Sequence, residues 1–367
     1  MSSNQKPRID FIDLIKGILI FTLLFHHSGI LVGNSLIARM SDSVRQPGFF
    51  VLAGLFFPNN TTFFNLTLNK INRIIIPYLL FAALYYIVDI SLNPSTLLTL
   101  SSPADWYRFL FYTHNSPTWF LTALFYAYII FYAIKPVLNR SSWFIQIAIV
   151  IAIGLAGRCL SEYLPYHFRE NSIFSLWYFT HFSVGIEVIP LVYAGYMFKR
   201  SRFFTYSPLP THRTLILVIA GIAWMTASTA TNSFFAYSYG NLQPVMFAST
   251  ISGFFFHWFI CQPIQRLPYI SYIGRYSIIV LGTHSIVLHV CGLLGSTSPW
   301  LNVAVTAAMM PPLIFVLTRY LPWLTAQRPL IPVPGERRRA VETAAPAFGG
   351  TIAGEGQELG AENLRKL

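Results

Sequence analysis

The chain has 367 residues, of which 54% are hydrophobic, 16% aromatic and only 10% charged. Soluble domains carry about 25% charged residues, so this composition excludes an ordinary soluble domain and predicts a protein that exposes most of its surface to lipid. The net charge of +12 does not indicate a nucleic-acid partner, because the basic residues lie mostly between apolar segments, as the positive-inside rule expects.

Apolar segments of near-spanning length predict about ten transmembrane helices, and hence an all-α, polytopic membrane helical bundle. They cover residues 11–33, 45–58, 73–92, 117–134, 143–157, 175–198, 214–232, 244–262, 271–294 and 301–321. If the N-terminus is cytoplasmic, five of the 25 Lys and Arg residues lie on the outer side, namely Arg39, Arg45, Arg108, Arg158 and Arg169. This bias places both termini in the cytoplasm.

Two regions follow from the composition. Residues 1–326 form the predicted membrane domain, and residues 327–367 are rich in Pro, Ala, Gly and Glu. Such a tail cannot bury a core, so we expect it to be disordered and cytoplasmic. Residues 93–117 are too polar to span and predict a helix lying at the outer interface. The three cysteines have no metal-binding spacing, so no metal site is expected.

The first apolar segment carries ionisable groups that membrane helices seldom contain. Asp13 and Lys16 stand near its start. His27 follows Asp13 by fourteen residues, which is about 21 Å along a helix. Ionisable residues inside a bilayer are costly and by default mark functional sites. We therefore favour a functional role for His27, with Lys70 and Arg73 as electrostatic partners.

Two further ionisable residues lie at a similar predicted depth. His284 stands thirteen residues into the segment 271–294, and Glu187 lies near the middle of 175–198. Both could share one polar cavity with His27, although for Glu187 a structural role is equally open. For the remaining buried histidines we favour hydrogen bonding that supports helix packing. These are His26, His181, His257 and His289.

A basic pair precedes the third apolar segment. Lys70 and Arg73 are three residues apart and therefore share one helix face at the cytoplasmic end. Ordinary positive-inside flanking would explain them, but two cations on one face would also suit a diphosphate. Asp10 and Asp13 form an acidic face at the same end, where they could pair with Lys16 or with the basic pair.

Six segments stand in order between residues 8 and 321. They are RIDFIDLIKGILIFTLLFHH, FFVLAGLFF, KINRIIIPYLLF, PTWFLTALF, IPLVYAGYMFKR and IGRYSIIVLGTHSIVL. Together they resemble the acyltransferase 3 family of integral membrane O-acyltransferases, especially its fucose 4-O-acetylase-like branch. The resemblance places the family's first histidine at His27, its two basic residues at Lys70 and Arg73, and its late histidine at His284. Ala53 stands where the family usually has Ser.

The resemblance implies transfer of an acyl group, commonly acetyl, from cytoplasmic acyl-CoA to a hydroxyl of a cell-surface or lipid-linked glycan. Acetyl-CoA would be a donor substrate rather than a bound cofactor, and the protein would lie in a bacterial inner membrane as a multi-pass protein. His27 would be the base or would itself carry the acyl group. Lys70 and Arg73 would hold the CoA phosphates, with Asp13 and Lys16 beside them.

Two points remain open at this stage. The oxyanion donor cannot be named from sequence, although His284 and Tyr276 are candidates. The chief alternative function is a transporter or flippase of a glycolipid or small molecule, which about ten helices with scattered buried charge would also suit. The chain shows neither inverted-repeat halves nor paired broken helices, and this favours the enzyme.

Overall fold

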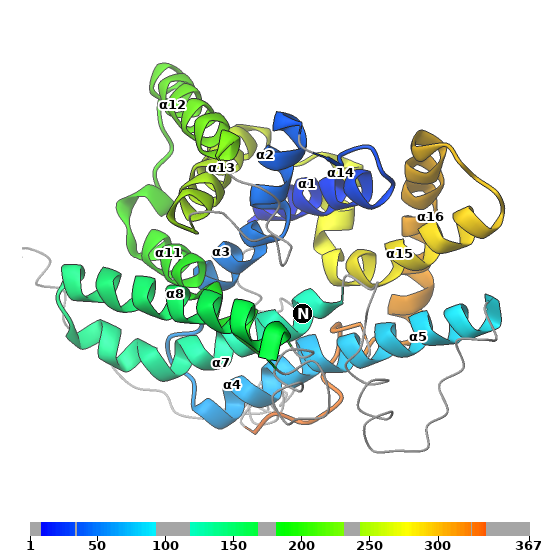
Figure 1. Ribbon diagram of the computed structural model, residues 1–367, viewed down its shortest axis with the longest axis horizontal. Helices are drawn as coiled ribbons and strands as arrows, with labels where there is room; N and C mark the ends of the chain where they lie inside the picture. The colour runs from blue at the N-terminus through cyan, green and yellow to red at the C-terminus, as the bar shows by residue number, and fades with distance from the viewer. Residues whose placement is uncertain are drawn as a thin grey trace, which may run out of the picture. The chain divides into compact units, whose positions relative to one another are not determined.

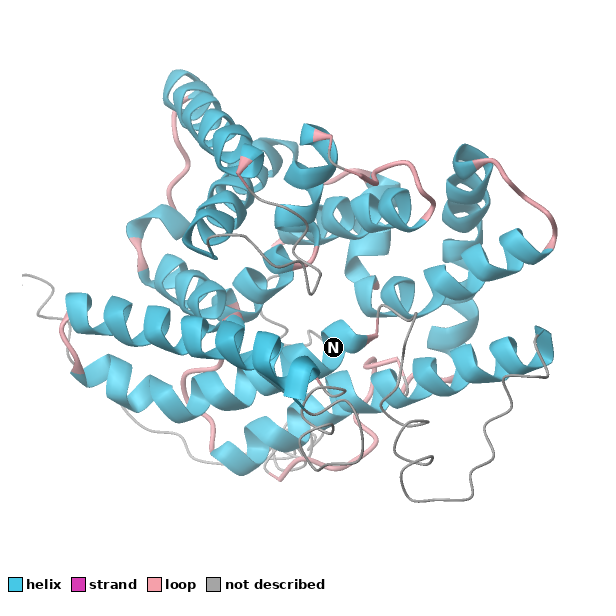
Figure 2. Ribbon diagram, viewed as in Figure 1, coloured by secondary structure: helices cyan, strands magenta, loops and turns pink. Residues whose placement is uncertain are grey.

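The computed structural model describes residues 9–33, 35–92, 118–167, 181–230, 243–323 and 325–334. These residues form helices and loops, with no strand among them (Figure 2). The chain divides into two compact units, Met1–Ile331 and Pro332–Leu367, and all the helices belong to the first. In chain order (Figure 1) they are α1 (Asp10–His27), α2 (Leu36–Arg45), α3 (Pro47–Leu55), α4 (Phe63–Lys70), the π-helical turn η1 (Ile71–Ile75), α5 (Ile76–Leu92), α7 (Trp119–Arg140), α8 (Trp143–His167), α10 (Phe182–Glu187), α11 (Ile189–Arg200), the 3-10 turn η3 (Arg202–Phe204), α12 (Pro210–Thr229), α13 (Gln243–Ile264), α14 (Pro268–Arg275), α15 (Ser277–Leu293) and α16 (Pro299–Tyr320).

Five helical segments of the described chain are long and apolar enough to cross a membrane. They are Phe63–Val88, Trp119–Arg140, Trp143–Ser161, Pro244–Ile264 and Pro299–Tyr320. The bent pair α14 and α15 would make a sixth span. An all-helical, multi-pass membrane protein is therefore confirmed. The count of about ten crossings and the cytoplasmic placement of both termini stay predictions, and the predicted interface helix at 93–117 lies outside the described residues.

Several predicted spans are not continuous straight helices. The second shrinks to α3, whose nine residues extend only about 14 Å. The sixth is interrupted at Val188, between α10 and α11, just before Pro190, which lacks a backbone N–H. The ninth bends by 95° between α14 and α15. The first ends at His27, and Gly29 then takes a left-handed φ of 93°.

Helix α1 packs against α2, α13, α14, α15 and α16, so it is central to the first unit. It meets α14 almost backbone to backbone at two glycines. A Cβ at Gly17 would overlap the carbonyl of Ile270, and a Cβ at Gly274 would overlap the carbonyl of Asp13. Small residues allow this approach, which holds membrane helices together by close packing. The contact fixes the place from which α15 starts.

An aromatic cluster near the start of α1 also packs against it. Trp258 of α13 is fully buried. Its ring lies edge-on to those of Phe11 and Phe198, with centroid distances of 4.8 Å in both pairs. Edge-to-face pairs of this kind stabilise by about 0.5–1.5 kcal/mol beyond the area they bury. The cluster therefore ties α1 to α13 and α11.

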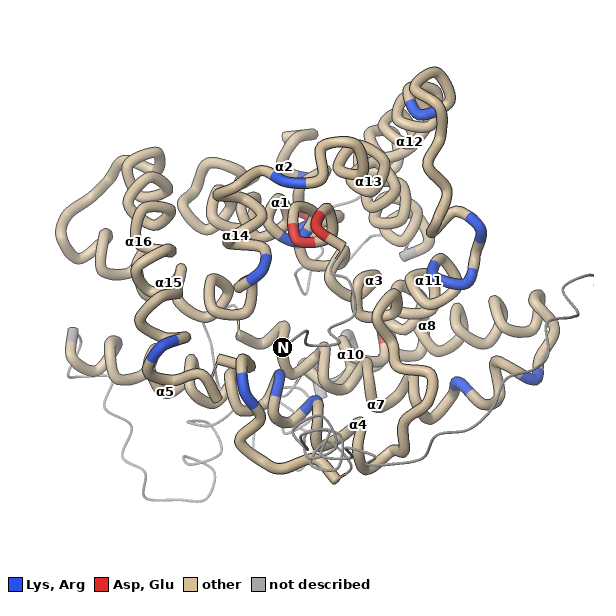
Figure 3. The backbone as a smooth tube through the Cα atoms, turned by 180° about the vertical axis from the view of Figure 1, so that it is seen from behind, with Lys and Arg blue, Asp and Glu red and all other residues tan. Residues whose placement is uncertain are grey.

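Charged residues are few inside this unit. Lys and Arg occur mostly near helix ends (Figure 3), and α13 and α15 carry no Lys, Arg, Asp or Glu. Four charged residues are nevertheless buried in the described part, with exposed fractions of 3–8%: Asp13, Asp42, Arg45 and Glu187. A buried charge is costly unless it is paired, so these positions and their partners indicate where function is to be sought.

Candidate active site

The two histidines singled out from the sequence lie side by side. His27 is the last residue of α1, and His284 lies in α15. Their ring centroids are 5.1 Å apart. His284 is fully buried, whereas His27 is exposed. The arrangement thus sets an accessible imidazole against a buried one.

The surroundings of His284 define its tautomer. Its Nδ1 lies 2.9 Å from the carbonyl oxygen of Val280. A carbonyl can only accept, so Nδ1 carries the proton and donates it. Nε2 of the neutral ring then holds a lone pair, which faces the Ser285 hydroxyl at 3.3 Å. A neutral ring beside His27 allows His27 to take up a proton without repulsion from a second imidazolium.

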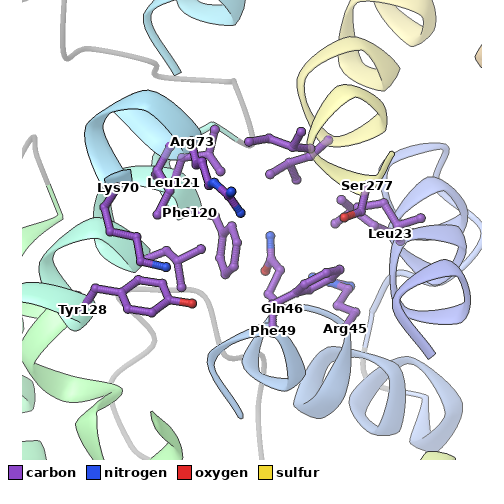
Figure 4. Close-up of a pocket in the computed structure, with 15 residues that line it drawn as sticks. Leu23, Arg45, Gln46, Phe49, Lys70, Arg73, Phe120, Leu121, Tyr128 and Ser277 are labelled. Carbon is purple, nitrogen blue, oxygen red and sulfur yellow. The ribbon is translucent and has the colours of Figure 1, made fainter. Parts of the chain in front are cut away.

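A cavity of about 180 Å³ lies between several helices, among them the two that carry the histidines. Its lining includes Leu23 and Leu281, which precede His27 and His284 by about one helical turn. Along α1 the cavity therefore ends about 6 Å from His27. Side chains from several helices line it, as Figure 4 shows. The cavity therefore lies beside both histidine helices, about one turn before each ring.

The basic pair lines this same cavity. Lys70 ends α4, and Arg73 lies in the π-helical turn η1 that follows. Such turns are rare and often occur at functional sites. The Lys70 ammonium lies 3.3 Å from the ring centroid of Tyr128. Arg73 points into the cavity from the side opposite Gln46 (Figure 4). Two cations are thus held within reach of one ligand.

Arg45, which charge counting assigns to the outer side, is buried, and the side of the membrane on which it lies stays a prediction. It is 3% exposed and lines the cavity, where its Nη1 donates to Asp42. Asp42 also lies 3.7 Å from Nδ1 of His26. Burial raises the pKa of the Asp42 carboxyl, and Arg45 opposes that rise. The sequence contained a signal for this ion pair. Asp42 and Arg45 are three residues apart, the same spacing that singled out Lys70 and Arg73.

Asp13 and Lys16 form an ion pair on α1, with 3.7 Å between Oδ1 and Nζ. Asp13 is mostly buried, where α14 packs against its backbone. The described lining of the cavity includes neither residue. The structure therefore gives them a pairing with each other, and a part in holding CoA stays a prediction.

Glu187 is held by a different pair of helices. Its Oε1 lies 3.8 Å from Nη1 of Arg158 on α8, and its Oε2 accepts from the Ser161 hydroxyl at 3.5 Å. Glu187 is not among the described residues that line the cavity. The structure thus brings His284 to His27 and places Glu187 in an ion pair at the contact of α10 with α8. A catalytic role for Glu187 stays a prediction.

The other polar candidates have identifiable partners. Tyr276 stands at the bend before α15, with its ring 5.2 Å from that of Tyr272. His26 donates from Nδ1 to the Leu31 carbonyl at 2.8 Å. His257 does the same toward the Gly253 carbonyl at 2.7 Å. The bonds of the two histidines agree with the structural role expected for them.

The comparison with known families covers nearly the whole helical unit. A family model described as an acyltransferase domain, of the acyltransferase 3 type, matches residues 9–324. No curated protein matches significantly, and neither does any solved structure. The matched range includes both histidines and the three cations around the cavity.

Proposed function

The chain belongs to the acyltransferase 3 family, and on that premise we propose that it is a membrane-bound O-acyltransferase of a bacterial inner membrane. It moves an acyl group, acetyl foremost, from cytoplasmic acyl-CoA to a hydroxyl of a cell-surface or lipid-linked glycan. Its motifs favour the fucose 4-O-acetylase-like branch. The observation that carries the proposal is the contact of His27 with His284 next to a cavity whose wall holds Lys70 and Arg73.

The cavity suits one part of the donor. Ligand sites usually measure about 300–1,000 Å³, so 180 Å³ accepts the slender pantetheine arm rather than the whole of CoA. Arg73 is exposed, and its guanidinium can bind phosphate oxygens in a bidentate manner. Lys70 adds a second positive charge. The nucleotide then stays at the mouth while the thioester approaches the histidines past Leu23 and Leu281.

The chemistry follows from the accessible imidazole. His27 removes the proton from the acceptor hydroxyl, and the oxygen attacks the thioester carbonyl carbon. A C–O bond forms while the carbonyl electrons move to oxygen. The oxyanion then collapses, the C–S bond breaks, and the CoA thiolate takes the proton back from His27. Because Nδ1 of His284 donates to a carbonyl and its ring is neutral, His27 meets no second imidazolium at this stage.

Purified protein in lipid nanodiscs, supplied with labelled acetyl-CoA, tests the proposal. Wild type should release CoA, slowly without acceptor and faster with a glycolipid carrying a free hydroxyl. His27→Ala should lower the rate by about 10²–10⁴-fold, as expected for loss of a general base. The neighbouring His26→Ala is the matched control and should keep most of the activity. Wild-type protein that moves glycolipid across the bilayer without consuming thioester would instead favour a flippase.

The acceptor can be identified separately in cells. Mass analysis of surface glycans from a deletion strain should show loss of one acyl mass, and the size of the loss names the group. Restoration by wild type and not by His27→Ala would link the modification to this site. Unchanged glycans in the deletion strain would contradict a cell-surface acceptor while leaving the thioester chemistry to be judged on the purified protein.

A further inference from the structure

We propose that Arg45 is a catalytic residue that binds the oxyanion formed on the thioester carbonyl. The inference deepens the proposed function and rests on it. Arg45 comes from α2, whose ten residues are too few to count among the candidate membrane spans, yet its side chain is 4% exposed. It lines the same cavity as Leu23, which stands one helical turn before His27. The other two cations on that lining, Lys70 and Arg73, come from α4 and η1.

The guanidinium is held in place and only partly used. Its Nη1 donates to Asp42, which fixes the plane of the group. Its Nε is buried and has no hydrogen-bond partner in the described structure. Buried donors are nearly always satisfied, and an exception calls for an explanation. A substrate oxygen that arrives during the reaction would satisfy this one.

The position relative to His27 fits such a role. Arg45 donates to Asp42, whose Oδ1 lies 3.7 Å from Nδ1 of His26, the residue that precedes the proposed base His27. Figure 4 shows Arg45 and Gln46 across the cavity from Lys70 and Arg73. A thioester arriving from the basic pair would therefore meet Arg45 on the wall that it reaches last.

Asp42 explains how the cation remains buried between turnovers. A buried guanidinium without a counter-ion would be very costly, and the carboxylate supplies that counter-ion. When the carbonyl becomes an oxyanion, negative charge appears beside a donor that is already oriented. Donors fixed in this way stabilise the transition state because no reorganisation is needed, and loss of one typically slows the reaction by about 10²–10³-fold.

Variants of Arg45 distinguish oxyanion binding from phosphate binding and from a purely structural role. Arg45→Gln should lower kcat for acetyl transfer by about 10²–10³-fold and leave the KM for acetyl-CoA within about threefold. The outcome that contradicts the inference is a raised KM with unchanged kcat, which would make Arg45 a third phosphate ligand. Rescue of the cavity variant Arg45→Gly by added methylguanidinium, measured as a regained kcat, is expected for a catalytic group and not for a purely structural one.

A second variant serves as the control for misfolding. Asp42→Asn/Arg45→Gln leaves no charge in the buried pair, so it should fold and still show the full loss of kcat. If only Arg45→Lys folds, its shorter reach from Asp42 should still lower kcat at least tenfold. If these variants fold and turn over at the wild-type rate, the catalytic role of Arg45 is refuted and the proposed function is not affected. A wild-type protein that never consumes acetyl-CoA overturns this inference together with the proposed function.

Discussion

Asn72, in the π-helical turn η1, hydrogen-bonds to the backbone of Leu330 and Ile331. Replacing Asn72 should loosen the attachment of these two residues to η1. Its Oδ1 accepts from the backbone N–H groups of Leu330 and Ile331, at 2.9 and 2.8 Å. Its Nδ2 donates to the Ile331 carbonyl at 2.8 Å and to the Leu68 carbonyl at 3.0 Å. Asn72 is 2% exposed, whereas Leu330 and Ile331 are 52% and 37% exposed. Hydrogen bonds, rather than burial of the Leu330 and Ile331 side chains, therefore hold these two residues in place.

The magnitude can be worked out from these bonds. Asn72→Ala removes the three that reach residues 330–331, and each contributes about 0.5–1.5 kcal/mol net. The attachment should weaken by about 2–4 kcal/mol. Since about 1.4 kcal/mol corresponds to a tenfold change, the amides of Leu330 and Ile331 should exchange with deuterium about 30 to 700 times faster. Because Asn72 lies in η1 between Lys70 and Arg73, the KM for acetyl-CoA should rise as well.

Asn72→Asp is the matched control. A carboxylate keeps the acceptor for both N–H groups but loses the two Nδ2 donors, so exchange at residues 330–331 should accelerate less than in Asn72→Ala. Exchange can be followed by mass spectrometry of peptides that contain these amides. Unchanged exchange in Asn72→Ala, or faster exchange in the aspartate variant than in the alanine variant, would refute the account of this attachment.

Three further changes have distinct expected outcomes. Gly54→Ala would place a Cβ onto the backbone of α11 and should lower Tm in detergent, since overpacking costs about 1–3 kcal/mol, whereas Gly292→Ala has open space around it and should leave Tm unchanged. Lys70→Gln or Arg73→Gln should each raise the KM for acetyl-CoA about tenfold with little effect on kcat, and a lowered kcat at constant KM would contradict phosphate binding. Tyr128→Leu removes the ring under the Lys70 ammonium and should raise that KM about 2–5-fold, from about 0.5–1 kcal/mol of cation–π energy, while Tyr128→Phe should not.

Helix positions could be predicted from the sequence because the thickness of a bilayer sets the length of an apolar segment. Each of the ten predicted segments contains helix in the described part of the chain. The interruption at Val188 and the bend at Tyr276 were not predicted, because apolar residues continue on both sides of them. Only Pro190 and Gly274 hinted at these positions, and both residue types also occur inside continuous membrane helices.

The site was predictable where charge stands out against an apolar background. His27, His284 and the basic pair were found in this way. Arg45 was missed because counting charges along the chain assigns a loop to one side of the membrane and gives no information about burial. The depth of His284 was counted along a straight helix from residue 271, which α14 and α15 do not form, so its meeting with His27 needs another explanation.

That explanation lies in two contacts along α1. Gly274 packs against the backbone at Gly17, and ten residues further along each segment His284 meets His27. Ten residues of α1 cover about 15 Å, and the stretch from Gly274 through the bend to His284 must cover the same interval. Because of the bend, the glycine contact fixes α14 against α1, and α15 contacts α1 at a different angle. The position of the two imidazoles thus depends on a contact of small residues well away from the chemistry.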